Sequence, residues 1–529
     1  MSSTGRRRRS MSWASPSSSS SSSSYPEPRP SHQLLQWKFS QVLGELPPES
    51  GGHRNGLAAL QVQEDEISAI EFDGGGEYLA AGDNAGRVII FRRTDGDDAG
   101  LHAWPRAELE RADFAGAPPP RYGYATEFQS HQPEFDVLNS LEISEKIKKI
   151  RWCARPNNRS LCMLATNDRT VKLWKVTEEH KAPKKGRREP PRWSTAALPL
   201  KEPFAERLAT KRRGSSADFA ERIEKVGDVG DGYSAKCRRV FDRAHEFNIN
   251  SISNNCDGET FVSADDLRIN LWHLEVTSQC FNIVDLKPKD MEDLVEVITT
   301  AEFHPSSCSL LAYGSSRGLL RLVDLRRSAL CDKSVRTFQD RGSRPQPHTF
   351  FTEIISCITD LKFTDEGRYL LTRDYMNLKL WDLRVETSPV ATYKVQESLR
   401  PKLAELYTED YIFDRFSCCA SKDGSSFATG SYSNTFKVFS RTAAQTTDTT
   451  LEASANPYRV QSHALTKIPS LLSSFSLGVG RKGQDGPRSD SKEEIPCNMA
   501  SRITHLTWHP MDNFIVCAAN SSLYMYHTT

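Results

Sequence analysis

The segment NDRTVKLW (Asn167–Trp174) alternates polar and apolar residues and ends on a large aromatic side chain. Related segments recur along the chain: GRVIIF (Gly86–Phe91), DDLRINLW (Asp265–Trp272), LLRLVDLR (Leu319–Arg326), MNLKLWDLR (Met376–Arg384), NTFKVF (Asn434–Phe439) and SSLYMY (Ser521–Tyr526). Alternation with a period of two is typical of β-strands that bury one face. Seven such strands, each belonging to a unit too small to bury its own faces, predict an all-β, seven-bladed β-propeller.

The predicted propeller occupies residues 34–529 and carries long insertions. Its blades are predicted to start at Ile67, Ile147, Ile249, Ile298, Ile358, Phe413 and Ile503. The insertions at about 94–120 and 441–498 are rich in glycine, proline, serine and threonine, which predicts solvated loops. The insertion at 180–234 contains basic clusters and has two interpretations, a solvated loop or an arm that reaches a partner.

Residues 1–33 form a leader of low complexity, with consecutive arginines at Arg6–Arg9 and consecutive serines at Ser17–Ser24. Such a segment has too little apolar surface to bury and is predicted to be disordered. Its basic, serine-rich composition also fits an organelle transit peptide. We favour disorder because a strand-like segment, QWKFSQV (Gln36–Val42), follows directly. This segment is predicted to supply the outer strand of blade seven and so close the ring.

The composition argues against several classes of protein. Lysine and arginine number 69 against 68 aspartate and glutamate, so bulk charge does not favour nucleic-acid binding. No apolar run reaches the length of a membrane span. The 12 cysteines are scattered without a C-x-x-C pair, which is typical of reduced thiols and predicts a cytoplasmic and nuclear location. The common motifs for phosphate loops, zinc proteases and serine hydrolases are missing, so no catalytic residue, metal site or cofactor is predicted.

Several acidic residues are predicted to share one face of the propeller. Strand direction alternates within a blade, so the turn between the second and third strands lies on the same face as the linker to the next blade. In blade three that turn carries Asp265 and Asp266, and in blade five it carries Asp374. The linker after blade three, Lys287–Val297, contributes Asp290, Glu292, Asp293 and Glu296. The pattern predicts an acidic face suited to a basic peptide or a basic protein surface.

These residues also have structural interpretations. An aspartate in such a turn commonly accepts backbone hydrogen bonds that fix the turn, a role predicted for Asp168 and left open for Asp265 or Asp266. Leu294, inside the acidic linker, is either a ligand contact or a staple of the loop. His245, which precedes the first strand of blade three, is predicted to hydrogen-bond the turn aspartate rather than to act in catalysis.

Longer segments point to one family: FQSHQPEFD (Phe128–Asp136), NSISNN (Asn250–Asn255), ADDLRINLWHLE (Ala264–Glu275), FNIVDLKP (Phe281–Pro288), EVITTAEFHP (Glu296–Pro305), FFTEIIS (Phe350–Ser356) and TGSYSN (Thr429–Asn434). In these segments the chain resembles the WD-repeat B-type (55 kDa) regulatory subunit of protein phosphatase 2A, most of all its plant form. The resemblance covers most of the chain from about Gln36 onward.

The resemblance implies a WD-repeat propeller without catalytic activity, which works beside a HEAT-repeat scaffold (A) subunit and a separate catalytic (C) subunit. It would control specificity by holding phosphoprotein substrates with basic segments near the active site of that partner. The positions that match the family's substrate groove are Asp266, Leu294, Glu292, Phe247, Asn248, Asp374 and Lys379. In the family, an arm after the third strand of blade two grips the scaffold. The stretch His180–Ser234 departs from that pattern apart from Leu198-Pro199-Leu200.

Two other functions remain open from the sequence. A WD-repeat substrate receptor of a ubiquitin ligase would use the same fold, and a stand-alone hydrolase could use a loop site on the propeller. The long family segments argue against the first function. The missing metal ligands argue against the second.

Overall fold

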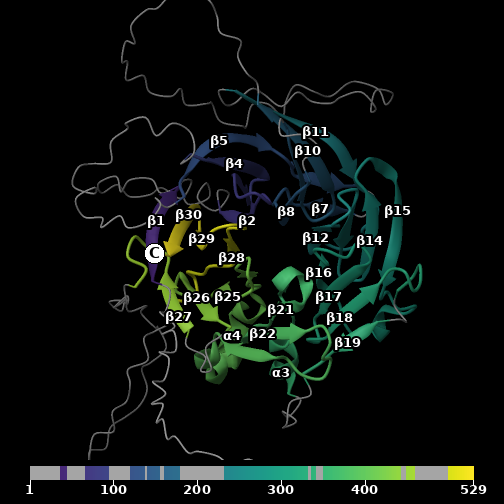
Figure 1. Cartoon of the computed structure of the whole chain (residues 1–529). Helices are drawn as coiled ribbons and strands as arrows, with labels where there is room; N and C mark the ends of the chain where they lie inside the picture. The colour runs from purple at the N-terminus through teal and green to yellow at the C-terminus, as the bar shows by residue number, and fades with distance from the viewer. Residues whose placement is uncertain are drawn as a thin grey trace, which may run out of the picture. The chain divides into compact units, whose positions relative to one another are not determined.

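Seven four-stranded antiparallel sheets are arranged in a ring in the computed structural model of the chain (Figure 1). The structure describes residues 36–44, 66–94, 120–137, 140–154, 160–178, 232–331, 335–340, 349–441, 448–458 and 498–528. No helix in these ranges is long and apolar enough to cross a membrane. The predicted all-β, seven-bladed propeller is confirmed.

The first four blades follow one another along the chain. Blade one consists of β2 (Ile67–Phe72), β3 (Tyr78–Asp83), β4 (Arg87–Arg93) and β5 (Tyr122–Gln129). Blade two consists of β8 (Lys149–Trp152), β9 (Ser160–Thr166), β10 (Val171–Glu178) and β11 (Tyr233–Phe241). Blade three consists of β12 (Ser251–Asn254), β13 (Thr260–Ala264), β14 (Arg268–His273) and β15 (Val276–Asp285). Blade four consists of β16 (Ile298–Phe303), β17 (Leu310–Ser315), β18 (Leu320–Asp324) and β19 (Arg336–Phe338).

The last three blades complete the ring. Blade five consists of β20 (Asp360–Thr364), β21 (Tyr369–Arg373), β22 (Asn377–Asp382) and β23 (Ala391–Lys394). Blade six consists of β24 (Cys418–Ala420), β25 (Ser426–Gly430), β26 (Thr435–Ser440) and β27 (Asp448–Glu452). Blade seven consists of β28 (His505–Trp508), β29 (Phe514–Ala519), β30 (Ser522–Thr528) and β1 (Trp37–Leu43). Blade six begins later than predicted, because Phe413 lies in a helical linker that precedes the first strand.

The ring is closed by a strand from the opposite end of the chain. Strand β1 pairs antiparallel with β30, with Trp37 opposite Thr528 and Leu43 opposite Leu523. The Trp37 side chain is 1% exposed and packs edge-on against Trp508, with 5.5 Å between ring centroids. The prediction that this segment supplies the outer strand of blade seven is therefore confirmed.

The large residue that ends each repeat packs in the core between blades. These residues are all less than 9% exposed: Phe91, Trp174, Trp272, Val323, Trp381, Phe439 and Tyr526. These side chains project from the third strand of each blade and contact the neighbouring sheet, for example where Trp272 packs against Phe241 of blade two. The alternation seen in the sequence thus arises because each sheet is covered on both faces by neighbouring blades.

One hydrogen bond recurs at most junctions between blades. An isoleucine N–H at the start of one blade donates to a carbonyl in the second turn of the blade before it. The pairs are Ile67 with Asn520, Ile147 with Asp83, Ile249 with Asp168, Ile298 with Asp266, Ile358 with Ser315 and Ile503 with Ser431. The turns between second and third strands therefore lie beside the linkers, as predicted. We call this side of the propeller the linker face.

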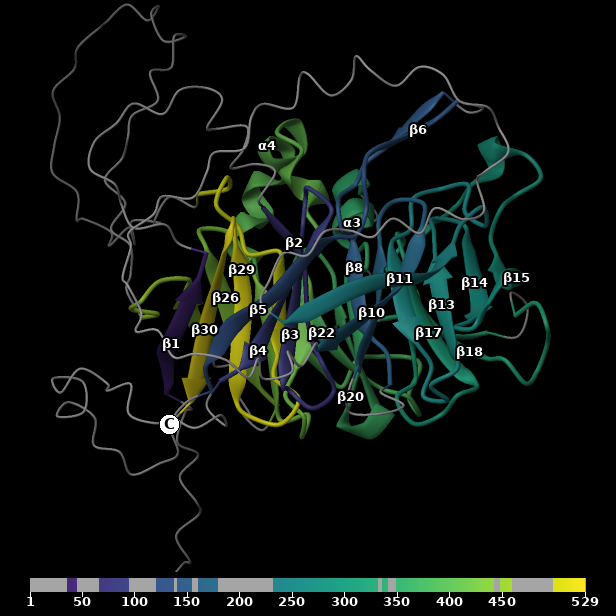
Figure 2. The same ribbon diagram turned by 90° about the horizontal axis from the view of Figure 1, so that it is seen from above.

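The linker face also carries the helical segments. Figure 2 shows α3 (Phe350–Ile355), α4 (Leu403–Thr408) and the β6 strand (Glu134–Asp136) rising from one side of the ring. Strand β6 pairs with β7 (Leu141–Ile143) in a hairpin between blades one and two. The linkers between blades also contain the short 3-10 helices η2 (Met291–Asp293), η4 (Glu397–Lys402) and η5 (Tyr411–Phe413). A further one, η3 (Asp365–Gly367), lies in the β20–β21 turn on the opposite face.

The predicted leader at 1–33 lies outside the described residues, as does most of the predicted insertions. The described parts show where each insertion leaves and rejoins the propeller. The first precedes β5 and the second leads into β11. The third contains β27, the outer strand of blade six, so the prediction of a loop throughout 441–498 was wrong.

Candidate functional site

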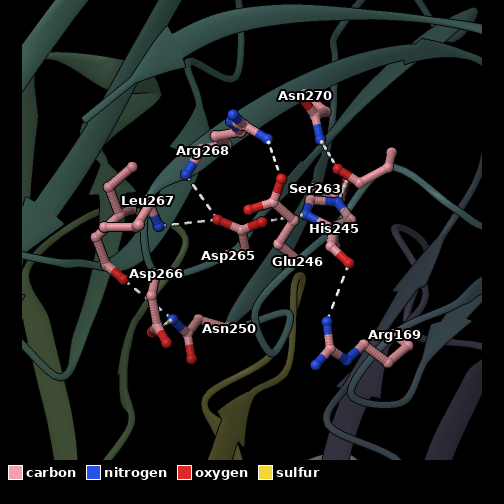
Figure 3. Close-up of polar contacts among 12 residues, drawn as sticks. Arg169, His245, Glu246, Asn250, Ser263, Asp265, Asp266, Leu267, Arg268 and Asn270 are labelled. Carbon is pink, nitrogen blue, oxygen red and sulfur yellow. Dashed lines mark hydrogen bonds and ion pairs between the residues drawn. The ribbon is translucent and has the colours of Figure 1, made fainter. Parts of the chain in front are cut away.

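Asp265 and His245 lie at the centre of a buried hydrogen-bond chain in blade three (Figure 3). His245 Nδ1 lies 2.8 Å from Asp265 Oδ2, and His245 Nε2 lies 2.6 Å from Ser263 Oγ. The indole N–H of Trp272 donates to Ser263 Oγ over 2.8 Å. Asp265 Oδ1 accepts the backbone N–H groups of Leu267 and Arg268 at 2.8 and 2.6 Å. The predicted bracing role of His245 is therefore confirmed, and Asp265 is the residue that fixes the turn.

Ser263, His245 and Asp265 are hydrogen-bonded in the same sequence as the serine, histidine and aspartate of a serine hydrolase triad. Unlike such a triad, they are not accessible to a substrate. Ser263 and Asp265 are 0% exposed, and the His245 side chain is 2% exposed. Ser263 Oγ already accepts a hydrogen bond from Trp272, so it cannot approach a substrate carbonyl without unpacking the blade. The cluster therefore stabilises the fold.

The turn in blade two is fixed by a different residue than predicted. Asn167 Oδ1 accepts the N–H groups of Arg169 and Thr170 at 3.0 and 2.8 Å. The Asp168 carboxylate instead pairs with Lys148 over 2.8 Å. The prediction for Asp168 was wrong, because asparagine accepts turn hydrogen bonds as well as aspartate does and here stands one position earlier.

Asp266 points away from the buried chain and onto the linker face. Its Oδ1 accepts a hydrogen bond from Asn250 Nδ2 at 2.7 Å, and its side chain is partly exposed. Its backbone carbonyl accepts the N–H of Ile298 at 2.7 Å, which ties the turn to the linker that follows blade three. Its second carboxylate oxygen has no hydrogen-bond partner among the residues that the structure describes.

The linker after blade three presents both charge and apolar surface. Asp290 caps η2 by accepting the N–H of Glu292 at 3.1 Å. Glu292 and Asp293 are exposed, and neither forms an ion pair with any residue that the structure describes. Leu294 is 37% exposed and Val295 is 66% exposed. The segment therefore offers two unpaired carboxylates beside two apolar side chains.

Other acids near this linker are neutralised by cations. Glu296 forms a bidentate ion pair with Arg321, in which Arg321 Nη1 lies 3.0 Å from Glu296 Oε2. Glu246 pairs with Arg268 at 3.2 Å and with Lys287 at 2.5 Å. Hydrogen bonding from Lys287 is the main cause that lowers the pKa of Glu246. The negative surface is therefore narrower than the count of acidic residues in the sequence suggests.

Asp374 and Lys379 belong to a separate group in blade five. Asp374 is 7% exposed, and its Oδ1 accepts the N–H groups of Met376 and Asn377 at 2.9 and 2.6 Å. Lys379 Nζ lies 3.5 Å from Asp374 and 3.4 Å from Asp340. Within the described ranges no hydrogen bond or ion pair joins these residues to Asp266. Asp374 thus resembles Asp265 in its structural role.

Phe247 lines a cavity of about 870 Å³ beside the β6–β7 hairpin. The cavity mixes exposed apolar and charged side chains, including Phe135, Leu141, Arg169, Arg243 and Arg268. The sequence signal for this hairpin was present in the FQSHQPEFD segment, but nothing in the chain order predicts that it stands beside blade three.

Asn248 and Asp266 line a second cavity, of about 430 Å³, at the inner ends of the blades. Sequence reasoning missed the basic residues of this cavity: Lys146, Lys148, Lys149, Arg415 and Arg502. Burial is the main cause that lowers the pKa of Lys149, and burial and Lys149 lower the pKa of His505 to about 3. The charged run EKIKK at Glu145–Lys149 is the signal that could have revealed the three lysines.

Known proteins similar to this chain are named for one assembly. A family model described as a WD domain, G-beta repeat, matches residues 235–273. The beta isoform of the B-type 55 kDa regulatory subunit of serine/threonine protein phosphatase 2A from Arabidopsis thaliana is 47% identical, covering 93% of this chain and 97% of that protein. The alpha isoform from Oryza sativa subsp. japonica is 46% identical, covering 94% and 85%. The 55 kDa regulatory subunit of Drosophila melanogaster is 41% identical, covering 93% and 86%. The chain therefore belongs to the family of B-type 55 kDa regulatory subunits of protein phosphatase 2A.

Proposed function

We propose that this chain recruits phosphoprotein substrates to a type 2A serine/threonine phosphatase and does not itself catalyse dephosphorylation. The recruiting surface would consist of Asp266 together with Glu292, Asp293 and Leu294 of the adjoining linker. The proposal is supported mainly by the exposure of Glu292 and Asp293, which form no ion pair among the described residues and lie in the linker whose end, Ile298, is bonded to the Asp266 carbonyl. A ligand with basic residues flanking an apolar one would complement this surface.

The proposed partners are a HEAT-repeat scaffold subunit and a separate catalytic subunit. Recruitment then acts through effective concentration, because a substrate held at a second contact meets the catalytic subunit more often than a free one does. We also propose a cytoplasmic and nuclear location, which suits the free thiols of the described cysteines. A fluorescent fusion of the whole chain tests the location.

Co-purification tests the assembly. The tagged full chain is expressed in its own cells, isolated under mild conditions, and the associated proteins are identified by mass spectrometry and assayed for phosphatase activity. We expect a HEAT-repeat protein and a metal-dependent phosphatase in stoichiometric amounts. Their absence would refute the assembly, and a ubiquitin ligase in their place would support the alternative of a substrate receptor for that enzyme.

Charge reversal tests the surface. The double variant Asp266→Lys with Glu292→Lys should weaken capture of basic phosphopeptides by about tenfold or more while the trimer stays assembled. Glu259→Lys is the matched control, because Glu259 is an exposed acid of the same blade in a turn on the opposite face. If the double variant captured substrates as well as the control did, the proposed recruiting surface would be wrong.

A further inference from the structure

Two exposed cysteines meet on neighbouring turns of blades three and four. Cys256 lies in the turn between β12 and β13, and Cys308 lies in the turn between β16 and β17. Both turns join a first strand to a second, so they lie on the face opposite the linker face. The Cys308 thiol is one of the groups that raise the pKa of Cys256, which places the two side chains near each other.

The two first strands are held side by side, and this brings the turns together. The hydroxyl of Ser251 accepts the N–H of Ala301 at 2.8 Å, and the hydroxyl of Ser253 accepts the N–H of Phe303 at 2.9 Å. These bonds tie β12 to β16 at two successive positions of the same strand face. The turns that extend from the two strands therefore have a fixed separation.

A single side chain then joins the backbones of the two cysteines. Asn255 Oδ1 accepts the N–H of Cys256 at 2.8 Å, and Asn255 Nδ2 donates to the carbonyl of Cys308 at 3.0 Å. Asn255 is 8% exposed, so this bridge is shielded from competing water. The cysteines are thus positioned as a pair by the fold, although 51 residues separate them in the chain.

The surroundings of the two thiols differ in charge. Partial burial, the Cys308 thiol and the Asp257 carboxylate all raise the pKa of Cys256. Arg326, which follows β18, interacts electrostatically with Cys308, but its guanidinium is also paired with the Asp324 carboxylate at 2.9 Å. A guanidinium favours a neighbouring thiolate, whereas a carboxylate disfavours one. We assign the first step to Cys308, because burial and the Asp257 carboxylate disfavour a thiolate at Cys256.

We propose that Cys256 and Cys308 are a redox-active pair that forms a disulfide between blades three and four on exposure to hydrogen peroxide. The Cys308 thiolate attacks one peroxide oxygen, which gives a sulfenic acid and a hydroxide that becomes water with the thiol proton. The Cys256 sulfur then attacks the sulfenic sulfur, which forms the S–S bond and releases a second water. Two thiols lose two hydrogens and two electrons, and one peroxide is reduced to two waters.

The disulfide would link two blades that carry the proposed recruiting surface. Asp266 belongs to blade three, and its backbone carbonyl is bonded to Ile298 at the start of blade four. A covalent bond on the opposite face would restrain the motion of these blades relative to each other. It would also stabilise the folded chain, because it lowers the conformational entropy of the unfolded chain. The redox inference itself does not depend on the proposed function, because it concerns only the thiol pair.

Peptide mass spectrometry of the full chain tests the pair. The reduced protein is treated with one equivalent of hydrogen peroxide, remaining thiols are blocked, and the protein is digested without reductant. We expect one linked pair of peptides containing Cys256 and Cys308, two hydrogens lighter than the separate peptides. The protein should stay monomeric on a non-reducing gel. Its unfolding temperature should rise on oxidation and fall back to the value of the reduced protein when a thiol reductant is added.

Serine variants separate the two steps. In Cys256→Ser, Cys308 should remain as a sulfenic acid that a cyclic dione labels. In Cys308→Ser, peroxide should consume the Cys256 thiol about tenfold more slowly. Cys280→Ser is the control, because Cys280 is an exposed thiol of the same blade, and this variant should still form the linked peptides. The proposal is overturned if peroxide oxidises other cysteines before this pair, if the link forms between molecules, or if Cys280→Ser abolishes it.

Discussion

Asp265 and Asp266 are neighbours in one turn, but the Asp265 carboxylate is buried and the Asp266 carboxylate is partly exposed to solvent. Asp265 is 0% exposed and binds His245 and two backbone N–H groups. Asp266 is partly exposed, and among the described residues its side chain binds Asn250 alone. Fixing one turn requires only one carboxylate. The second carboxylate is therefore not needed to fix this turn.

The first prediction concerns the stability of these two neighbours. Asp265→Ala should destabilise the chain by about 3 kcal/mol, because it leaves a buried histidine and two turn N–H groups without their acceptor. Asp266→Ala removes the same atoms from a partly exposed site and should cost less than about 1 kcal/mol. Urea unfolding of the two variants measures the difference. Equal losses would contradict the assignment of Asp265 to the turn.

The second prediction concerns a glycine that closes the ring between blades seven and one. Gly76 has a φ of +74°, and a Cβ built there would overlap the His509 ring, whose Nε2 lies 3.2 Å from the Gly76 carbonyl oxygen. Gly76→Ala should therefore cost more than about 2 kcal/mol, from backbone strain and from displacement of the ring. Gly74→Ala, in the same turn, meets nothing within 4 Å and is the matched control. Thermal unfolding that ranked the two variants equally would refute this account.

The third prediction concerns the closing strand. Trp37→Ala should cost about 3–5 kcal/mol, since it removes a fully buried ring that packs against Trp508. Loosening β1 would also expose the edge of β30 and promote association between molecules. Lys38→Ala, at an exposed position of the same strand, should change neither property. Unfolding curves and light scattering measure both effects, and a monomeric, stable Trp37→Ala protein would show that the strand is dispensable.

The fourth prediction concerns the loss of folding stability at acidic pH. Burial and Lys172 lower the pKa of His131 to about 3. An unfolded histidine has a pKa of about 6.5, so below that pH the unfolded chain binds a proton that the folded chain does not take up until about pH 3. The contribution of His131 to the free energy of unfolding therefore has its full value above about pH 6.5. It falls as pH decreases, by up to about 1.4 kcal/mol per pH unit.

The variant His131→Asn isolates this contribution, because asparagine does not titrate. Its unfolding free energy should depend less steeply on pH than that of the wild type, by up to one proton, between about pH 6 and about pH 4. Measurement of the slope is independent of any general loss of stability in the variant. An unchanged slope would show that His131 is protonated in the folded protein.

Much of the fold follows from local sequence. The strands ending at Trp174, Trp272 and Trp381 were evident because alternation reflects contacts of each residue with the layers above and below it. Closure by Gln36–Val42 followed from the need to cover the edge of blade seven. The prediction for Asp168 failed because asparagine and aspartate can accept the same backbone hydrogen bonds. In this turn Asn167, not Asp168, is the acceptor.

The candidate surface was predictable only in part. The sequence placed Asp266 and the linker after blade three on one face, because strand alternation determines the side on which a turn lies. It could not tell that Glu296 is neutralised by Arg321, that Glu292 is not, or that Lys149 lines the cavity next to Asp266. Pairing depends on distances between side chains from different blades, and no spacing along the chain encodes them.

The sequence by itself determined the number of blades, the strand that closes the ring and the face on which the acidic turns lie. These features arise from periodicity and strand direction, which are properties of neighbouring residues. The tertiary structure alone decided which acids remain unpaired and which cysteines meet. Cys256 and Cys308 come together because two serine hydroxyls and Asn255 tie β12 to β16, and such contacts exist only after the blades have packed.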